Sequence, residues 1–177
     1  LFRSNGQAGL RMLTKLSELE PLQHVCAQAL SQHLRAMGRV KEAETALLAV
    51  LKKSPRDLGT MIALADLYMH VGMPKLAYRL LVGARVAFGQ SMAVVPDMVQ
   101  AALMMGSVGE AIESLYLMHR VGTGDDDTTA FLARLLFAEG RESEAEKILN
   151  NNRAAFKKIQ SGWIAAEQQP QIGRAHV

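Results

Sequence analysis

The chain has 177 residues, of which 49% are hydrophobic and 21% are charged, and its formal net charge is +3. These values are ordinary for a globular protein. The sequence contains no uninterrupted apolar run of about 18 residues, which a membrane-spanning helix would need. Lysines and arginines are scattered without a basic stripe among aromatic residues, so we expect solvated helix faces and no nucleic-acid surface. The one cysteine, Cys26, excludes an intrachain disulfide and a cysteine-rich metal site, and we expect it to be a small buried apolar residue.

Four glycines divide the chain at a constant interval. They stand 34 residues apart, an alanine follows each glycine after five residues, and a leucine follows each alanine after four: Gly38, Gly72, Gly106 and Gly140; Ala43, Ala77, Ala111 and Ala145; Leu47, Leu81, Leu115 and Leu149. A period of this length is typical of a helix-turn-helix unit stacked on copies of itself. Because strand signals are scarce, the sequence predicts an all-α fold built from helical hairpins.

The recurring residues have physical reasons. Glycine adopts the left-handed conformation without a side-chain clash, so we expect each glycine to end the first helix of a hairpin. Alanine lets two helices cross closely, so we expect the alanines to be buried between helices. Pro96 stands near the start of a first helix, where a missing N–H costs least, and we expect it to shorten that start rather than kink the helix.

On these columns, which are most complete around Leu64, Ala65, Tyr68, Gly72 and Ala77, the chain resembles the tetratricopeptide repeat family. The resemblance implies a right-handed superhelical solenoid of antiparallel helix hairpins. In its frame, residues 1–23 hold the second helix of a truncated repeat, complete repeats follow at 24–57, 58–91, 92–125 and 126–159, and a further repeat or capping helix starts at 160–170. Trp163 then falls on the family's tryptophan position.

For the last residues we expect a different origin. Residues 172–177 read Ile-Gly-Arg-Ala-His-Val, which is one translation of a common short-read sequencing adaptor, and Gln171 fits a codon that overlaps it. We therefore expect adaptor read-through at 171–177 and a biological sequence that ends near Pro170. The chain also begins at Leu1, inside a repeat, which predicts a fragment of a longer protein.

Candidate catalytic and metal-binding groups are sparse. The histidines His24, His33, His70 and His119 are far apart and lack zinc-ligand spacing. The run 125–127, three aspartates, lacks the alternating ligands of a calcium loop, and we expect it to cap the start of a helix. No nucleophile and base form a recognisable constellation, so we expect neither catalysis nor a cofactor or metal in this segment.

The resemblance also implies a binding surface. In the family, the first helices of successive repeats line a concave groove that receives a peptide or helix of a partner protein. The contact positions are the second, fifth, ninth, twelfth and thirteenth of each repeat, which here give the predicted groove residues Gln28, Gln32, Arg35, Ile62, Asp66, Met69, His70, Gln100, Leu103, Met104, Arg134 and Phe137.

The composition of this groove favours one kind of partner. Members that hold a C-terminal carboxylate use a lysine and asparagines at three of these positions, which Gln28, Gln32 and Arg35 do not reproduce. Methionine adapts to irregular partners, so Met69 and Met104 favour an apolar segment. Arg35 and Arg134 are predicted to flank the apolar centre and to orient an acidic peptide.

We therefore expect a protein-protein interaction scaffold that binds a partner peptide or helix and is not an enzyme. Two alternatives stay open: a docking appendage of a larger multidomain enzyme, and an RNA-binding helical-repeat protein, which the constant spacing and the lack of a basic groove disfavour. A soluble, cytoplasmic location is favoured, and a periplasmic or secreted one stays open. The sequence leaves the partner, the pathway and the oligomeric state undetermined.

Overall fold

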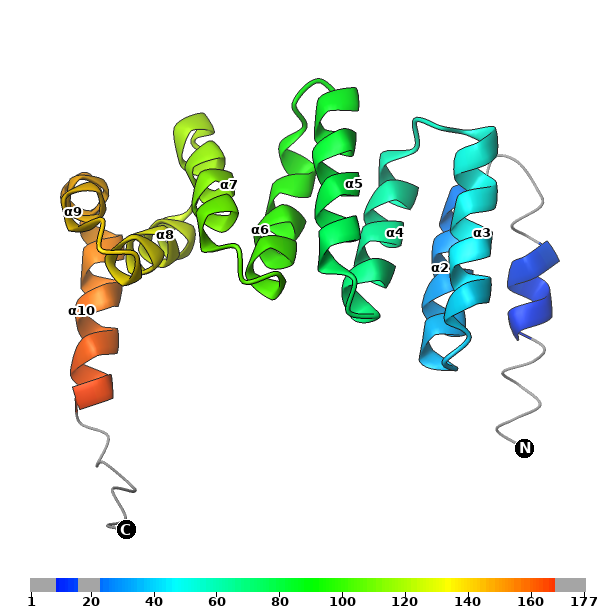
Figure 1. Cartoon of the computed structure of the whole chain (residues 1–177), viewed down its shortest axis with the longest axis horizontal. Helices are drawn as coiled ribbons and strands as arrows, with labels where there is room; N and C mark the ends of the chain where they lie inside the picture. The colour runs from blue at the N-terminus through cyan, green and yellow to red at the C-terminus, as the bar shows by residue number, and fades with distance from the viewer. Residues whose placement is uncertain (1–8, 16–22, 168–177) are drawn as a thin grey trace, which may run out of the picture. The chain divides into compact units, whose positions relative to one another are not determined.

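The computed structural model describes residues 9–15 and 23–167. Within these ranges all regular structure is helical, which confirms the all-α prediction (Figure 1). The expectations for residues 1–8, 16–22 and 168–177, which include the adaptor-derived tail, lie outside the described residues.

The chain forms two units, residues 1–107 and residues 108–177, which we call unit 1 and unit 2. Unit 1 holds a short helix at residues 9–15 followed by α2 (Gln23–Ala36), α3 (Val40–Lys53), α4 (Leu58–His70), α5 (Pro74–Ala87), the 3-10 helix η1 (Met92–Val94) and α6 (Val95–Met104). Unit 2 holds α7 (Val108–Val121), α8 (Asp126–Ala138), α9 (Glu142–Asn150) and α10 (Arg153–Glu167).

In unit 1 the helices stack as hairpins. Helix α2 packs on α3 and α4 packs on α5, while α3 contacts α4 and α5 contacts α6. The first helices also contact each other in sequence, α2 with α4 and α4 with α6. Each hairpin thus packs against the next one along the chain, as in a repeat array.

The glycine turns have the predicted conformation. Gly38, Gly72, Gly106 and Gly140 have φ angles of +74°, +77°, +73° and +71°. At Gly72 the glycine N–H donates to the Met69 carbonyl at 3.1 Å, and the Met73 N–H donates to the Tyr68 carbonyl at 2.8 Å. This pair of bonds satisfies carbonyls that would otherwise be free at the end of α4. The same pair recurs after each of the other three glycines.

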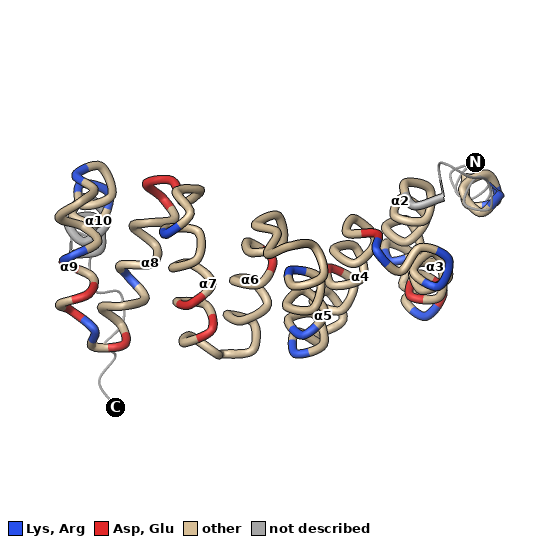
Figure 2. The backbone as a smooth tube through the Cα atoms, turned by 90° about the horizontal axis from the view of Figure 1, so that it is seen from above, with Lys and Arg blue, Asp and Glu red and all other residues tan. Residues whose placement is uncertain are grey.

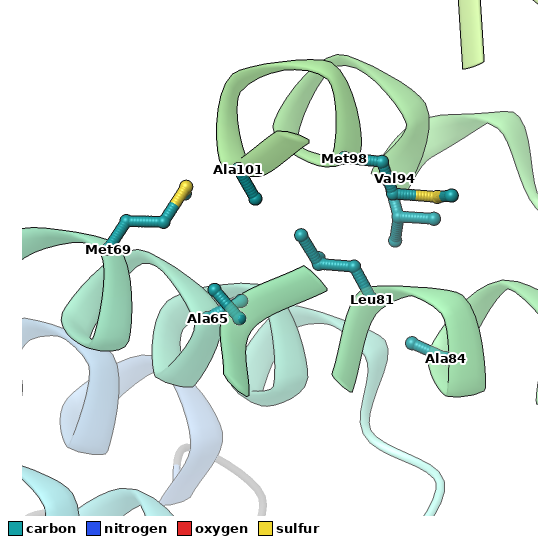
Figure 3. Packing of buried hydrophobic residues seen from close by; sticks show 8 residues of the cluster. Ala65, Met69, Leu81, Ala84, Val94, Met98 and Ala101 are labelled. Atoms are coloured by element: carbon teal, nitrogen blue, oxygen red, sulfur yellow. The ribbon is translucent and has the colours of Figure 1, made fainter. Parts of the chain in front are cut away.

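The alanine and leucine columns form the interior. All four alanines are 0% exposed, and the leucines are at most 4% exposed. In unit 1, Leu81 of α5 lies against Val94 and Met98 at the next repeat, and Met69 and Ala101 complete the same cluster (Figure 3). Cys26 is buried as predicted, with 8% exposure.

Pro96 occupies the first turn of α6, as predicted, and the helix has 10 residues. The 3-10 helix η1 precedes it, and the Ser91 hydroxyl accepts the Ala93 N–H at 3.3 Å at its start. The irregularity is therefore confined to the beginning of the repeat.

In unit 2 the helix boundaries depart from the repeat frame. Helix α9 ends at Asn150 and α10 begins at Arg153, so the expected boundary after residue 159 falls inside α10. Asparagine is a weak helix former, and three asparagines stand in a row here. The Asn152 side chain accepts the Ala155 N–H at 2.9 Å and donates to Asp126 at 2.9 Å. It thereby starts α10 and ties it to α8.

Two tyrosine-carboxylate bonds connect neighbouring repeats. The Tyr68 hydroxyl donates to Glu44 at 2.8 Å, and burial followed by this bond raises the Tyr68 pKa to about 12. In unit 2, Tyr116 donates to Glu144 at 2.9 Å, and Arg141 holds the same carboxylate with two bonds of 2.8 Å. The Arg141 bonds, and then the Tyr116 bond, lower the Glu144 pKa to about 2.

Candidate partner-binding surface

The first helices of unit 1 carry unusually few charged side chains. Among Asp, Glu, Lys and Arg, α2 has only Arg35, α4 only Asp66 and α6 only Asp97, whereas α3 and α5 carry several each (Figure 2). Charged residues are depleted at the centres of protein interfaces relative to the rest of a protein surface. The row of first helices, α2–α4–α6, is therefore the candidate contact surface.

The three charges of this row lie together. Arg35 donates to Asp66 at 2.5 Å, which joins α2 to α4. Burial, and then the nearby Asp66 carboxylate, raises the pKa of Asp97 on α6. One positive and two negative groups leave a net negative centre on the row. Arg35 is therefore already paired with a carboxylate of the row.

The predicted groove residues of unit 1 differ in accessibility. Those at the ninth repeat position, Gln32, Asp66 and Gln100, are all exposed, as are His70, Leu103 and Met104; Gln28, Arg35 and Ile62 are partly buried. A Cβ on Gly59 would lie 2.7 Å from the Gln28 amide nitrogen. Gln28 therefore lies against the first turn of α4 and fills space between two first helices.

Met69 is a correction to the sequence prediction. Its side chain is only 4% exposed and belongs to the core cluster with Leu81 and Ala101 (Figure 3). The twelfth repeat position of α4 thus faces the core cluster that α4 shares with α5 and α6. Met69 is a packing residue and offers nothing to a partner.

In unit 2, Arg134 is exposed and Phe137 is partly buried on α8. Arg134 borders a cavity of about 510 Å³ between α8 and α10, lined by Asp127, Ala130, Phe131, Arg134, Lys158 and Ile159. Lys158 donates to Asp127 at 2.6 Å on its rim. The acidic run also caps α8 as predicted, since Asp125 accepts the Thr128 N–H at 2.7 Å.

Sequence reasoning missed Asp97, which falls at none of the family contact positions. It belongs to the row because the fold brings it near Asp66, and nothing in the local sequence signals that proximity. Among the described residues, no group of three or more His, Cys, Asp or Glu could hold a metal ion. In the same ranges, every helix is too short or too polar to cross a membrane.

Solved structures with a similar arrangement of helices identify the fold. The chain is similar to MamA from Desulfovibrio magneticus RS-1, with a TM-score of 0.63 and 15% identity over 95% of this chain and 90% of that one. It is also similar to a tetratricopeptide repeat protein from Parabacteroides merdae, with a TM-score of 0.64 and 16% identity over 89% of this chain and 60% of that one. This chain has the tetratricopeptide-repeat fold.

The chain is similar as well to PilF from Pseudomonas aeruginosa, with a TM-score of 0.64 and 17% identity over 86% of this chain and 70% of that one. No family model and no curated protein matches the sequence. The likeness therefore identifies the fold alone.

Proposed function

We propose that this tetratricopeptide-repeat chain is a protein-interaction scaffold that binds a partner segment along the α2–α4–α6 row. The observation that carries the proposal is the depletion of charge on that row, next to second helices that carry ordinary surface charge. No bond is made or broken; the array presents a preformed surface to another protein.

The exposed side chains indicate what such a segment contains. Leu103 is 36% and Met104 is 48% exposed near the end of α6. They offer an apolar site that would release water when a large partner side chain covers it. The net negative centre at Asp66 and Asp97 favours a basic residue in the same segment.

The test compares two surfaces of equal exposure. Peptides are selected from a random library on the immobilised chain, and their affinities are measured for the double variant Leu103→Asp, Met104→Asp. The control is Val82→Asp, Leu48→Asp on second helices, where exposure is 37% and 46%. The matched exposure makes general effects on solubility and stability similar in both variants.

We expect the first double variant to weaken peptide binding by about tenfold or more, equivalent to about 1.4 kcal/mol, and the control to leave it unchanged. The selected peptides should be enriched in Lys or Arg beside large apolar residues. Equal loss in both variants, or selected Lys- or Arg-containing peptides that bind the Leu103 and Met104 variant as tightly as the parent, would contradict the proposed surface.

A further inference from the structure

The first turns of the second helices provide an internal comparison. In α3, Arg39 precedes the helix and makes two bonds to Glu42, of 2.7 and 2.6 Å. In α9, Arg141 makes two bonds to Glu144 in the same way. The two residues of each pair are three apart, and the second pair stands 102 positions, or three repeats, after the first. The fold thus places an ion pair at this point of two repeats.

The repeat at 92–125 has Ser107 and Glu110 at these two positions, without an ion pair, and the repeat at 58–91 departs further. Its residues at the two positions are Met73 and Leu76, each 34 residues after its counterpart in α3. They are 49% and 46% exposed. Two large apolar side chains therefore face water at a point where the same fold elsewhere uses charge, and neither is needed to fill the core.

These two side chains do not stand alone. They line a cavity of about 400 Å³ together with four neighbours in unit 1, and we call the six residues the α5 shoulder: Gly72, Met73, Pro74, Lys75, Leu76 and Met105. This volume is within the range of clefts that hold small ligands, roughly 300–1,000 Å³, so it can receive a large side chain. Methionines give the lining an adaptable shape.

Charge narrows the choice of occupant. Lys75 is the one charged residue of the shoulder, it is exposed, and it forms no ion pair within the described part of the chain. No carboxylate lines the cavity. An occupant with an anionic group beside an apolar group would therefore match both features of the shoulder.

We propose that the α5 shoulder is a second docking site, which takes a partner-protein segment with a large apolar side chain in the cavity and a carboxylate against Lys75. The residues differ from those of the α2–α4–α6 row, so the site is independent of the function proposed above. A symmetric contact with a second copy would bring Lys75 toward its own counterpart, which like-charge repulsion disfavours. An anionic membrane surface attracts clusters of several cations, and the shoulder has one.

The decisive variant introduces at the start of α5 the arginine and glutamate that form the ion pairs of α3 and α9. Met73→Arg with Leu76→Glu should rebuild the ion pair of α3 and α9, so the fold should persist, as circular dichroism can verify. The matched control is Val86→Glu, which adds charge at a 61% exposed apolar residue of the same helix. Lys75→Glu tests the charge separately.

The probes are fluorescein-labelled octapeptides in which Leu or Phe stands beside Asp, beside Lys or beside Ser, with anionic phospholipid vesicles as a separate arm. Binding to the full chain is followed by fluorescence anisotropy and by NMR of ¹³C-methyl methionine. We expect Asp peptides to bind and to shift the Met73 and Met105 signals. The Met73→Arg, Leu76→Glu variant should weaken the binding of Asp peptides by about tenfold, and the Val86→Glu control should leave it unchanged. Lys75→Glu should reverse the preference toward Lys peptides.

The proposal is overturned if the ion-pair variant binds Asp peptides as well as the parent, or if none of them binds at millimolar concentration. It is also overturned if vesicles, rather than peptides, shift the Met73 and Met105 signals, or if the variant abolishes concentration-dependent self-association while no peptide binds. Substitutions at Leu103 and Met104 should leave the affinity for Asp peptides and the peptide-induced shift of the Met73 signal unchanged, which separates this test from that of the first-helix row.

Discussion

Replacing Gly72 by alanine should destabilise the protein, and replacing Gly83 by alanine should stabilise it. Gly72 has a φ angle of +77°, and a Cβ there would meet no heavy atom within 4 Å. The penalty is therefore conformational rather than steric, about 1–2 kcal/mol for an L-residue in the left-handed region. Gly83 is exposed inside α5 and a Cβ there is equally unobstructed, so alanine should contribute about 0.5–1 kcal/mol through its lower unfolded-state entropy.

The two variants should thus differ by about 1.5–3 kcal/mol in unfolding free energy, although the chemical change is identical. Urea denaturation followed by far-UV circular dichroism measures this difference, and for a chain of this size Tm should move by about 2–4 °C per kcal/mol. Gly72→Asn should recover part of the loss, since asparagine tolerates the left-handed conformation. Shifts of the same sign at both positions, or no loss at Gly72, would refute the role assigned to the turn.

Three further outcomes can be measured. Ala77→Leu should lower the unfolding free energy by about 1–3 kcal/mol because Ala77 is 0% exposed. The control Ala49→Leu, at an exposed site, should change it by less than about 0.5 kcal/mol. Equal urea midpoints for the two variants would contradict the proposed packing of Ala77. NMR should show the Glu144 carboxyl titrating near pH 2. Its contribution to stability is therefore complete above the ordinary carboxyl pKa of 4.5 and is lost as the pH falls through 2. Arg141→Ala should raise the pKa of Glu144. Ultraviolet titration should show the Tyr68 phenol ionising near pH 12, its contribution to stability being complete below pH 10 and lost as pH rises through 12; Tyr68→Phe should remove this step.

The sequence predicts the hairpin interior well because the requirements there are local. A hairpin needs a residue in the left-handed backbone conformation where its first helix ends, and a close helix crossing needs a small side chain. The residue types at Gly72 and Ala77 therefore predict their environments. The start of α6 is equally readable, since a proline inside a helical segment is tolerated only in the first turn.

Other features depend on contacts between helices, which the 34-residue spacing in the sequence does not predict. Met69 occupies a family contact position, yet its burial follows from the space between α4, α5 and α6. The proximity of Asp97 to Asp66 likewise depends on how α6 lies on α4. The early start of α10 arises from a cap by Asn152, which competes locally with the repeat frame. The charge depletion of the first-helix row was visible in the sequence, but its meaning required knowing which helices contact each other.

The burial of Cys26 gives the protein an intrinsic kinetic probe. Its thiol is 8% exposed within α2, so a thiol-specific reagent can modify it only when the packing around α2 opens transiently. Because no second cysteine competes, the reaction rate at low denaturant reports the opening frequency of that end of the array, and the same measurement in the presence of a bound peptide would reveal whether occupancy holds it closed.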